Sequence, residues 1–210
     1  MRSKRNHGQR PNYQRASIAD EAARIMMERG MTDFRLAKAK ACERLGLNTG
    51  PLPSNEEVEA ALAARNRIFH GDRHDLQLRR LREAAVQVMR RLDAFSPRLV
   101  GSVLTGTATE HSAIDLHLYT DTPETVGAQL AALGLEARTI QFQHQWRRGE
   151  AQTVPGYRFY EQDFEYLAAV FPERRRAHAP LSRVDGRPMR RANQREVARL
   201  LDDEGLPSAL

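Results

Sequence analysis

The chain has a single cysteine, Cys42, few aromatic residues and no long apolar run. One cysteine excludes an internal disulfide framework and any zinc site that is built from several cysteines. No apolar stretch approaches the roughly 18 residues that a membrane-spanning helix needs. The basic N-terminus is not followed by a hydrophobic segment, so we do not expect a secretory signal. These absences predict a cytoplasmic bacterial protein without a membrane partner.

Basic residues gather in two segments of a chain whose formal net charge is +6. Residues 1–15 hold five arginines or lysines and no acid, and residues 172–191 hold seven arginines and two acids. Such segments attract polyanions because they neutralise phosphates and release counterions. RNA or another polyanion is therefore a candidate partner through residues 1–15 and 172–191. The alternative is a solvated tail and a solvated loop.

The first half of the sequence predicts a tail followed by helices. Residues 1–15 are basic, polar and without hydrophobic periodicity, which is typical of a disordered tail. Residues 16–95 carry apolar residues at helical spacing, so we expect a helical region. Within it we expect one helix to end near Phe69 and a fourth helix to follow a polar turn around Gly71.

The pattern changes at Pro97. Residues 96–210 contain strand-like stretches at 98–104, 113–119, 138–147, 157–160 and 164–171, with a helix after the second of them. A capping signature, Asn193 to Glu196, predicts a last helix. The order of elements predicts an α+β fold, in which a helical N-terminal region precedes a mixed sheet with flanking helices.

A glycine-rich segment carries the clearest functional signal. It begins with Gly101 and Ser102, continues through Gly106, and runs into a predicted strand that contains Asp115. Glycine lets a backbone approach phosphates closely, and a serine hydroxyl or N–H can donate to a phosphate oxygen. Carboxylates on a strand can hold a metal ion against the phosphates. Glu165, in an apolar predicted strand, is the candidate for a further acid, because a carboxylate there needs a cation or donors.

This segment resembles the signature of the polymerase-β-like nucleotidyltransferase superfamily, in which Gly-Ser and a later glycine precede Ser-Asp-x-Asp-Leu. The whole chain is also similar to uncharacterised bacterial proteins with such a domain. The resemblance implies a nucleotidyltransferase-type core over residues 96–210. It implies that Gly101, Ser102 and Gly106 bind a nucleoside triphosphate, and that Asp115 and Glu165 bind Mg²⁺ or Mn²⁺ and act in catalysis.

The sequence departs from that signature at one position. Ala113 stands where the superfamily has its first metal-binding aspartate. His117, two residues beyond Asp115 on the same predicted strand face, is a possible further metal ligand, although imidazole suits Mn²⁺ or Zn²⁺ better than Mg²⁺. The other roles for these residues are structural. Asp115 would then be a capping or ion-paired acid, Glu165 a partner of Arg158, and His117 a buried histidine with satisfied hydrogen bonds.

Two classes of function follow from this pattern. In the first, the protein transfers a nucleoside monophosphate from a nucleoside triphosphate to an unknown acceptor hydroxyl by metal-assisted in-line displacement. In the second, it is a catalytically degenerate member of the fold that binds a nucleotide or nucleic acid without turnover. Ala113 favours the second class, whereas Asp115 and Glu165 favour the first.

Overall fold

The computed structural model describes the backbone of residues 9–47 and 51–204 and, within these ranges, the side chains outside residues 9–12, 67–72 and 204. The fold is α+β, as predicted, with helices at the N-terminus and around a five-stranded mixed sheet. The chain separates into two compact units. Of the described residues, 9–47, 51–74, 109–111 and 183–185 make up the helical unit, and 75–108, 112–182 and 186–204 make up the sheet unit. Among the described residues, no helix combines the length and apolar composition required to cross a bilayer.

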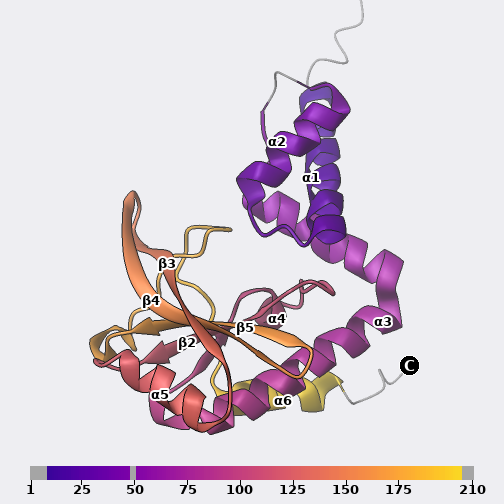
Figure 1. Ribbon diagram of the computed structural model, residues 1–210. Coiled ribbons are helices and arrows are strands. Elements are labelled where there is room, and N and C mark those ends of the chain that lie inside the picture. Colours follow the sequence, from indigo (N-terminus) through magenta and orange to yellow (C-terminus); the bar gives the residue numbers. More distant parts are fainter. Residues whose placement is uncertain (1–8, 48–50, 205–210) are drawn as a thin grey trace, which may run out of the picture. The chain divides into compact units, whose positions relative to one another are not determined.

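The helical unit contains α1 (Gln9–Arg29), α2 (Phe34–Leu45) and the first part of α3 (Asn55–Arg91), which pack together in Figure 1. Apolar residues on the facing sides of these helices form its core. The buried members of this cluster are Ile18, Ala19, Ala22, Ile25, Met26, Ala37, Ala41 and Val58.

Local capping signals fix the ends of these helices. The Asp33 carboxylate accepts a hydrogen bond of 3.0 Å from the Leu36 amide at the start of α2, and Gly46 ends that helix with φ 65°. At the start of α3, the Ser54 amide donates to the Glu57 carboxylate at 2.6 Å, and the Glu57 amide donates to the Ser54 hydroxyl at 3.1 Å. This reciprocal pair is a capping box, which the Ser-x-x-Glu spacing of the sequence favours.

Three boundaries differ from the sequence predictions. Helix α1 begins at Gln9, so residues 9–15 are helical rather than part of a disordered tail, and residues 1–8 lie outside the described part of the chain. Helix α3 continues through the predicted turn at Gly71, because one interior glycine costs only about 1 kcal/mol. The compact units meet at residues 74 and 75 rather than at 95 and 96, because the second part of α3 packs against the sheet.

The sheet unit follows one chain order. Its elements are the second part of α3, η1 (Asp93–Phe95), β1 (Arg98–Val100), α4 (Gly101–Thr105), β2 (Ile114–Tyr119), α5 (Glu124–Ala132), β3 (Ala137–Arg147), β4 (Glu150–Glu161), β5 (Phe164–Phe171), η2 (Glu173–Arg175) and α6 (Gln194–Glu204). The strand order is β1-β2-β5-β4-β3. Only the β2–β5 pair is parallel, and the other neighbours are antiparallel.

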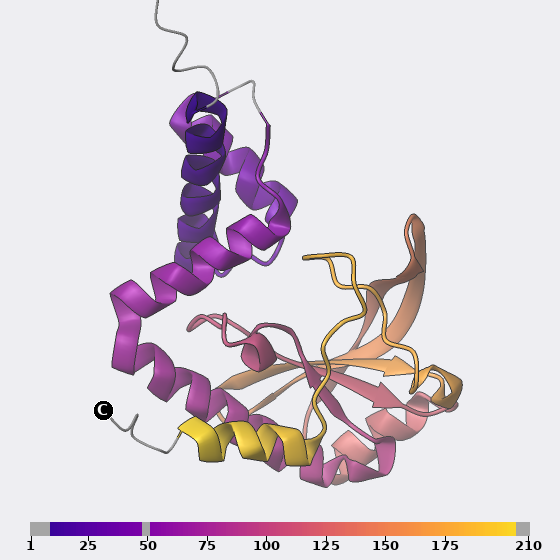
Figure 2. The same ribbon diagram turned by 180° about the vertical axis from the view of Figure 1, so that it is seen from behind.

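Helices cover one face of this sheet. Figures 1 and 2 show α5, α6 and the second part of α3 along the same side of the strands. The core on this side includes Leu81, Met89, Leu99, Ile114, Leu116, Leu118, Val126, Leu130, Phe159, Tyr166, Val170 and Val197. Alternation along the strands places the remaining side chains on the opposite face, which we call the distal face. In β2 and β5 these are Asp115, His117, Tyr119, Glu165, Leu167, Ala169 and Phe171.

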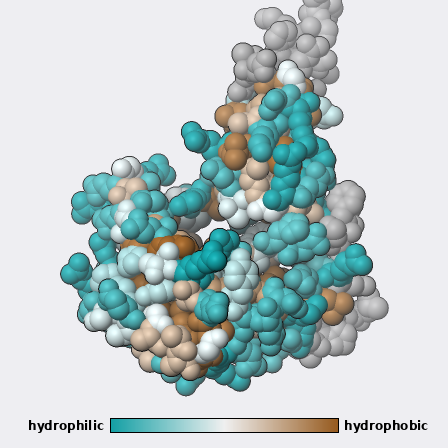
Figure 3. Space-filling view, viewed as in Figure 1, coloured by the Kyte–Doolittle hydropathy of each residue, from teal (hydrophilic) through white to brown (hydrophobic). Residues whose placement is uncertain are grey.

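The protein surface matches its composition, in which 29% of residues are charged. Hydrophilic residues cover most of the surface visible in Figure 3. The apolar residues are concentrated instead in the separate cores of the two units.

Candidate functional site

The glycine–serine segment forms a tight turn between β1 and β2. The predicted strand at 98–104 ends at Val100, because Gly101 takes φ 71° and opens the short helix α4. The Ser102 carbonyl accepts hydrogen bonds from the Gly106 amide at 2.9 Å and the Thr107 amide at 3.0 Å. Gly106, with φ 85°, therefore closes the turn that Gly101 and Ser102 begin.

A buried arginine that the sequence did not identify supports this turn. Arg82 of α3 donates from Nε to the Val103 carbonyl at 3.0 Å and from Nη2 to the Leu104 carbonyl at 3.1 Å. Hydrogen bonds from a charged donor to the last carbonyls of a helix are among the stronger polar contacts in a protein interior. Arg82 therefore fixes the backbone that carries Gly101 and Ser102.

Asp115 lies directly against the backbone of Gly101. The pairing of β1 with β2 sets Val100 opposite Asp115, one residue before the turn. A Cβ atom at Gly101 would collide with the Asp115 Oδ2 atom. Both the left-handed φ and this close approach explain why position 101 is a glycine.

Asp115 and Glu165 share the distal face of the sheet, as predicted. In the parallel β2–β5 ladder, Asp115 pairs with Leu167, and Glu165 lies two residues before Leu167 on the same face. The first pair of this ladder is Ile114 with Tyr166. One further step of the same register places Ala113 opposite Glu165, so an acid at position 113 would stand beside both carboxylates.

Asp115 carries the most unusual carboxyl group of the site. Burial and the nearby charge of Glu165 raise the pKa of Asp115 to about 7. A carboxyl group with this pKa is partly protonated at neutral pH, and a bound cation would favour its ionised form. Among the described residues, no arginine, lysine or histidine forms an ion pair with Asp115. The predicted alternative of an ion-paired Asp115 is therefore not what the structure shows.

Glu165 has protein partners of its own on β4. Its Oε1 atom forms an ion pair with Arg158 and accepts a hydrogen bond of 3.3 Å from the Tyr160 hydroxyl. The β4–β5 register sets Tyr160 opposite Glu165 and Arg158 opposite Leu167. The pairing with Arg158 was the structural alternative from the sequence, and it is present. A metal ion at Glu165 would have to compete with this guanidinium.

His117 shares the distal face with Asp115 but belongs to an aromatic cluster. Its ring lies 5.3 Å from that of His144 and 4.6 Å from that of Phe171, measured between centroids. Burial, with the charges of His144 and Arg191, holds the pKa of His117 well below its ordinary value. Its Nδ1 atom is buried without a hydrogen-bond partner. Within the described chain, no group of three or more histidine, cysteine or acidic side chains is arranged to hold a metal ion.

A separate hollow of about 220 Å³ lies on the helix-covered side of the sheet unit. Its lining includes Arg80 and Glu83 of α3 and Gln162 and Tyr166 near the β4–β5 turn. Tyr166 points away from the distal face, because it alternates with Glu165 along β5. This hollow is therefore distinct from the site of Asp115 and Glu165.

No protein-family model, curated protein or solved structure matches this chain. The fold class therefore follows from the geometry of the chain itself. Membership of the nucleotidyltransferase superfamily stays a prediction from the Gly101–Leu116 segment.

Proposed function

We propose that the sheet unit binds the phosphates of a nucleoside triphosphate, together with one divalent cation, and does not perform two-metal nucleotidyl transfer. The observation that carries this proposal is the contact of the Asp115 carboxyl with the Gly101 backbone. It brings a carboxylate without a protein cation into contact with the glycine that opens the turn. Phosphates and a divalent cation are the chemical groups that such a combination binds.

The residues present fit one Mg²⁺ or Mn²⁺ better than two. Asp115 and Glu165 supply hard oxygen ligands on one face, and burial together with the nearby charge of Glu165 raises the pKa of Asp115. A bound ion would supply positive charge and orient the phosphates. Position 113, beside Asp115 and Glu165, carries alanine and therefore offers no carboxylate to a second ion. Arg158 already forms an ion pair with the Glu165 carboxylate. These two features support binding without turnover.

A second candidate function is transfer of a nucleoside monophosphate to an acceptor hydroxyl. The pKa of Asp115, about 7, favours it, because a general base works best when its pKa is close to the operating pH. In this reaction Asp115 would accept the proton of the attacking hydroxyl, and pyrophosphate would leave. The two functions differ in one product, since only transfer releases pyrophosphate.

Calorimetric titration with ATP in the presence of Mg²⁺ tests the proposed function. We expect the wild type to bind, and Asp115→Asn to weaken binding at least about tenfold, or ~1.4 kcal/mol, because the variant lacks the charged metal ligand. Asp163→Asn, on the exposed β4–β5 turn, is the matched control and should bind like the wild type. Equal affinities of the wild type and Asp115→Asn would refute the site. Pyrophosphate release by the wild type, lost in Asp115→Asn, would establish the second candidate instead.

A further inference from the structure

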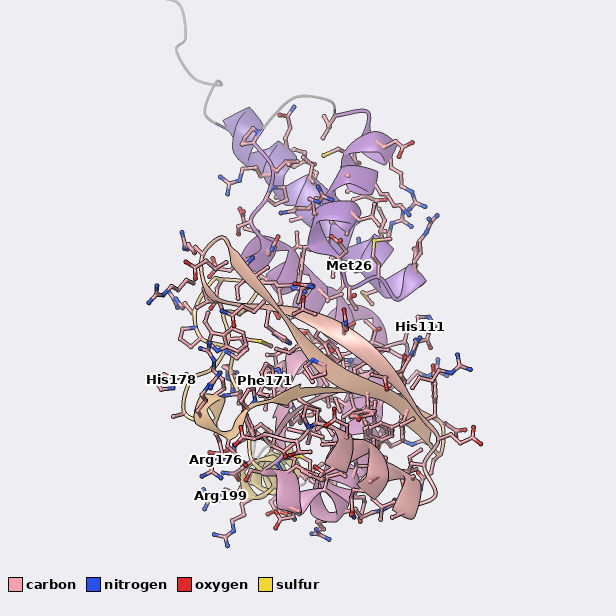
Figure 4. The ribbon with its side chains drawn as sticks, turned by 60° about the vertical axis from the view of Figure 1, so that its left-hand side comes forward. Met26, His111, Phe171, Arg176, His178 and Arg199 are labelled. Carbon is pink, nitrogen blue, oxygen red and sulfur yellow. The ribbon has the colours of Figure 1, made fainter. Side chains whose placement is uncertain are left out.

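Three arginines from separate segments of the sheet unit converge beside Tyr119, the last residue of β2. Arg98 is the first residue of β1, Arg176 follows η2, and Arg191 precedes α6. The Arg191 Nη1 atom donates to the Tyr119 hydroxyl at 2.7 Å and to the Arg176 carbonyl at 3.1 Å. Figure 4 shows Arg176 at the outer edge of the molecule. The Arg176 side chain is about half exposed, whereas Tyr119 is only 1% exposed, so solvent reaches the cluster from the side of Arg176.

Ser96 and a short β-bridge hold the three segments together. The Arg176 Nη1 atom donates to the Ser96 hydroxyl at 3.1 Å, and the Arg98 Nη1 atom donates to the Ser96 carbonyl at 3.4 Å. The backbones of Leu99 and Ala192 exchange hydrogen bonds of 2.8 and 3.0 Å, which fixes the chain next to Arg191 against β1. The positions of the guanidinium groups are thus set by the fold and not by a common acidic partner.

The cluster has a large excess of positive charge. The acceptors of the three arginines are neutral hydroxyl and carbonyl oxygens. Among the described residues, the only carboxylate within 4 Å of any of them is that of Glu173, 3.8 Å from Arg176, and both side chains of this pair are about half exposed. An exposed pair at this distance compensates little charge. Each guanidinium has five N–H donors, so several remain for a ligand.

The donor set matches a tetrahedral anion. Arginine binds phosphate oxygens through two parallel N–H donors, and a planar guanidinium is better suited to this than the ammonium of lysine. The Tyr119 hydroxyl accepts from Arg191 and keeps its own proton for donation. The charges of Arg191, Arg98 and Arg176 also oppose the rise that burial causes in the pKa of Tyr119. The same positive field would stabilise a bound anion.

We propose that Arg98, Arg176, Arg191 and the Tyr119 hydroxyl bind a phosphate group of a nucleotide or polynucleotide, at a site separate from that of Asp115. Both sites lie on the distal face of β2. Tyr119 follows Asp115 by four residues, which corresponds to about 13 Å along a strand. The arginine site does not require Asp115, Glu165 or a metal ion, so it stands independently of the function proposed above.

Titration of the full chain with inorganic phosphate, followed by NMR or calorimetry, tests this site. We expect saturable binding that weakens at least tenfold in Arg191→Gln and in Arg176→Gln. Arg90→Gln removes the same charge from an exposed position of α3, on the other side of the sheet, and should change the affinity less than twofold. Equal losses in Arg90→Gln and Arg191→Gln, or no saturable binding at 10 mM phosphate, would overturn the proposal.

Tyr119→Phe separates binding from folding, because it removes only the hydroxyl and keeps the buried ring. It should retain the melting temperature within a few degrees and weaken phosphate binding several-fold. Unchanged phosphate affinity in Tyr119→Phe would remove the hydroxyl from the site. Uridine 5′-monophosphate and an RNA oligonucleotide without terminal phosphates then distinguish the source of the group. Binding of the mononucleotide alone identifies a terminal phosphate, binding of the RNA alone identifies a backbone phosphate, and binding of neither overturns the proposal.

Discussion

Replacing Asp115 by asparagine should change how the stability of the sheet unit depends on pH. The carboxyl of Asp115 is buried beside Glu165, and its pKa is about 7 in the folded protein against an ordinary value of 3.8. Between these two values the folded state keeps a proton that the unfolded state has released. The contribution of Asp115 to the free energy of unfolding therefore falls as the pH rises from about 4 to about 7. Asparagine has the same shape and no titration, so Asp115→Asn should lack this contribution.

The size of the effect follows from the same two pKa values. Each tenfold difference in proton affinity is worth about 1.4 kcal/mol, which gives about 4 kcal/mol over the whole interval. About 3 kcal/mol of this lies between pH 5 and pH 8, a range that avoids general acid unfolding. The stability of Asp115→Asn relative to the wild type should accordingly increase by about 3 kcal/mol from pH 5 to pH 8.

Urea unfolding followed by tryptophan fluorescence measures this difference in stability for the sheet unit, which contains Asp115. Trp146 is the only tryptophan in the chain, and its ring lies 5.8 Å from that of Phe171 in the sheet unit. Asp163→Asn, on the exposed turn, is the control and should stay within about 0.5 kcal/mol of the wild type at each pH. If the difference between Asp115→Asn and the wild type is the same at pH 5 and pH 8, Asp115 does not have the raised pKa.

Other changes test the turn at Gly101, the metal site and the basic segments. Gly101→Ala should lower the free energy of unfolding by about 2–4 kcal/mol, because φ is 71° and the new Cβ collides with Asp115; urea unfolding that matches the wild type would contradict this. Ala113→Asp should tighten binding of Mg²⁺ and ATP about tenfold, or ~1.4 kcal/mol, since it adds an oxygen ligand beside Glu165; an unchanged calorimetric affinity would show that position 113 lies outside the metal site. RNA affinity, if residues 1–15 and 172–191 bind a polyanion, should fall steeply with salt, and deleting residues 1–8 should flatten that slope; binding independent of salt would exclude this partner.

Local features of the fold could be predicted from the sequence because they depend on neighbouring residues. The capping box that starts at Asn193 forms with the expected partner, Glu196, and the caps at Asp33 and Ser54 likewise involve residues three positions apart. The continuous path of α3 through Gly71 could not be predicted in this way. The packing of its second part against the sheet involves residues far along the chain, and it offsets the local cost of a glycine.

The candidate site was predictable only in part for the same reason. Strand alternation and the motif placed Asp115 and Glu165 on one face. Only the parallel β2–β5 register, continued by one residue, places Ala113 opposite Glu165. The supporting role of Arg82 depends on a contact across 21 residues. The arginine cluster at Tyr119 brings residues 172–191 against Ser96 and the end of β2. The sequence showed that residues 172–191 are basic, but it could not show which of these arginines lie near Tyr119.

The proposed phosphate site depends on Asp115, whose negative charge a divalent cation would compensate. The most direct test is the titration of its carboxyl carbon by NMR in protein labelled with ¹³C-aspartate, with Asp115→Asn used for assignment. We expect a pKa of about 7 for Asp115 in the protein alone, and a pKa well below this once Mg²⁺ and ATP are added, because the cation favours the ionised form. A pKa near 4 without ligand, or a pKa of about 7 that Mg²⁺ and ATP leave unchanged, would contradict it.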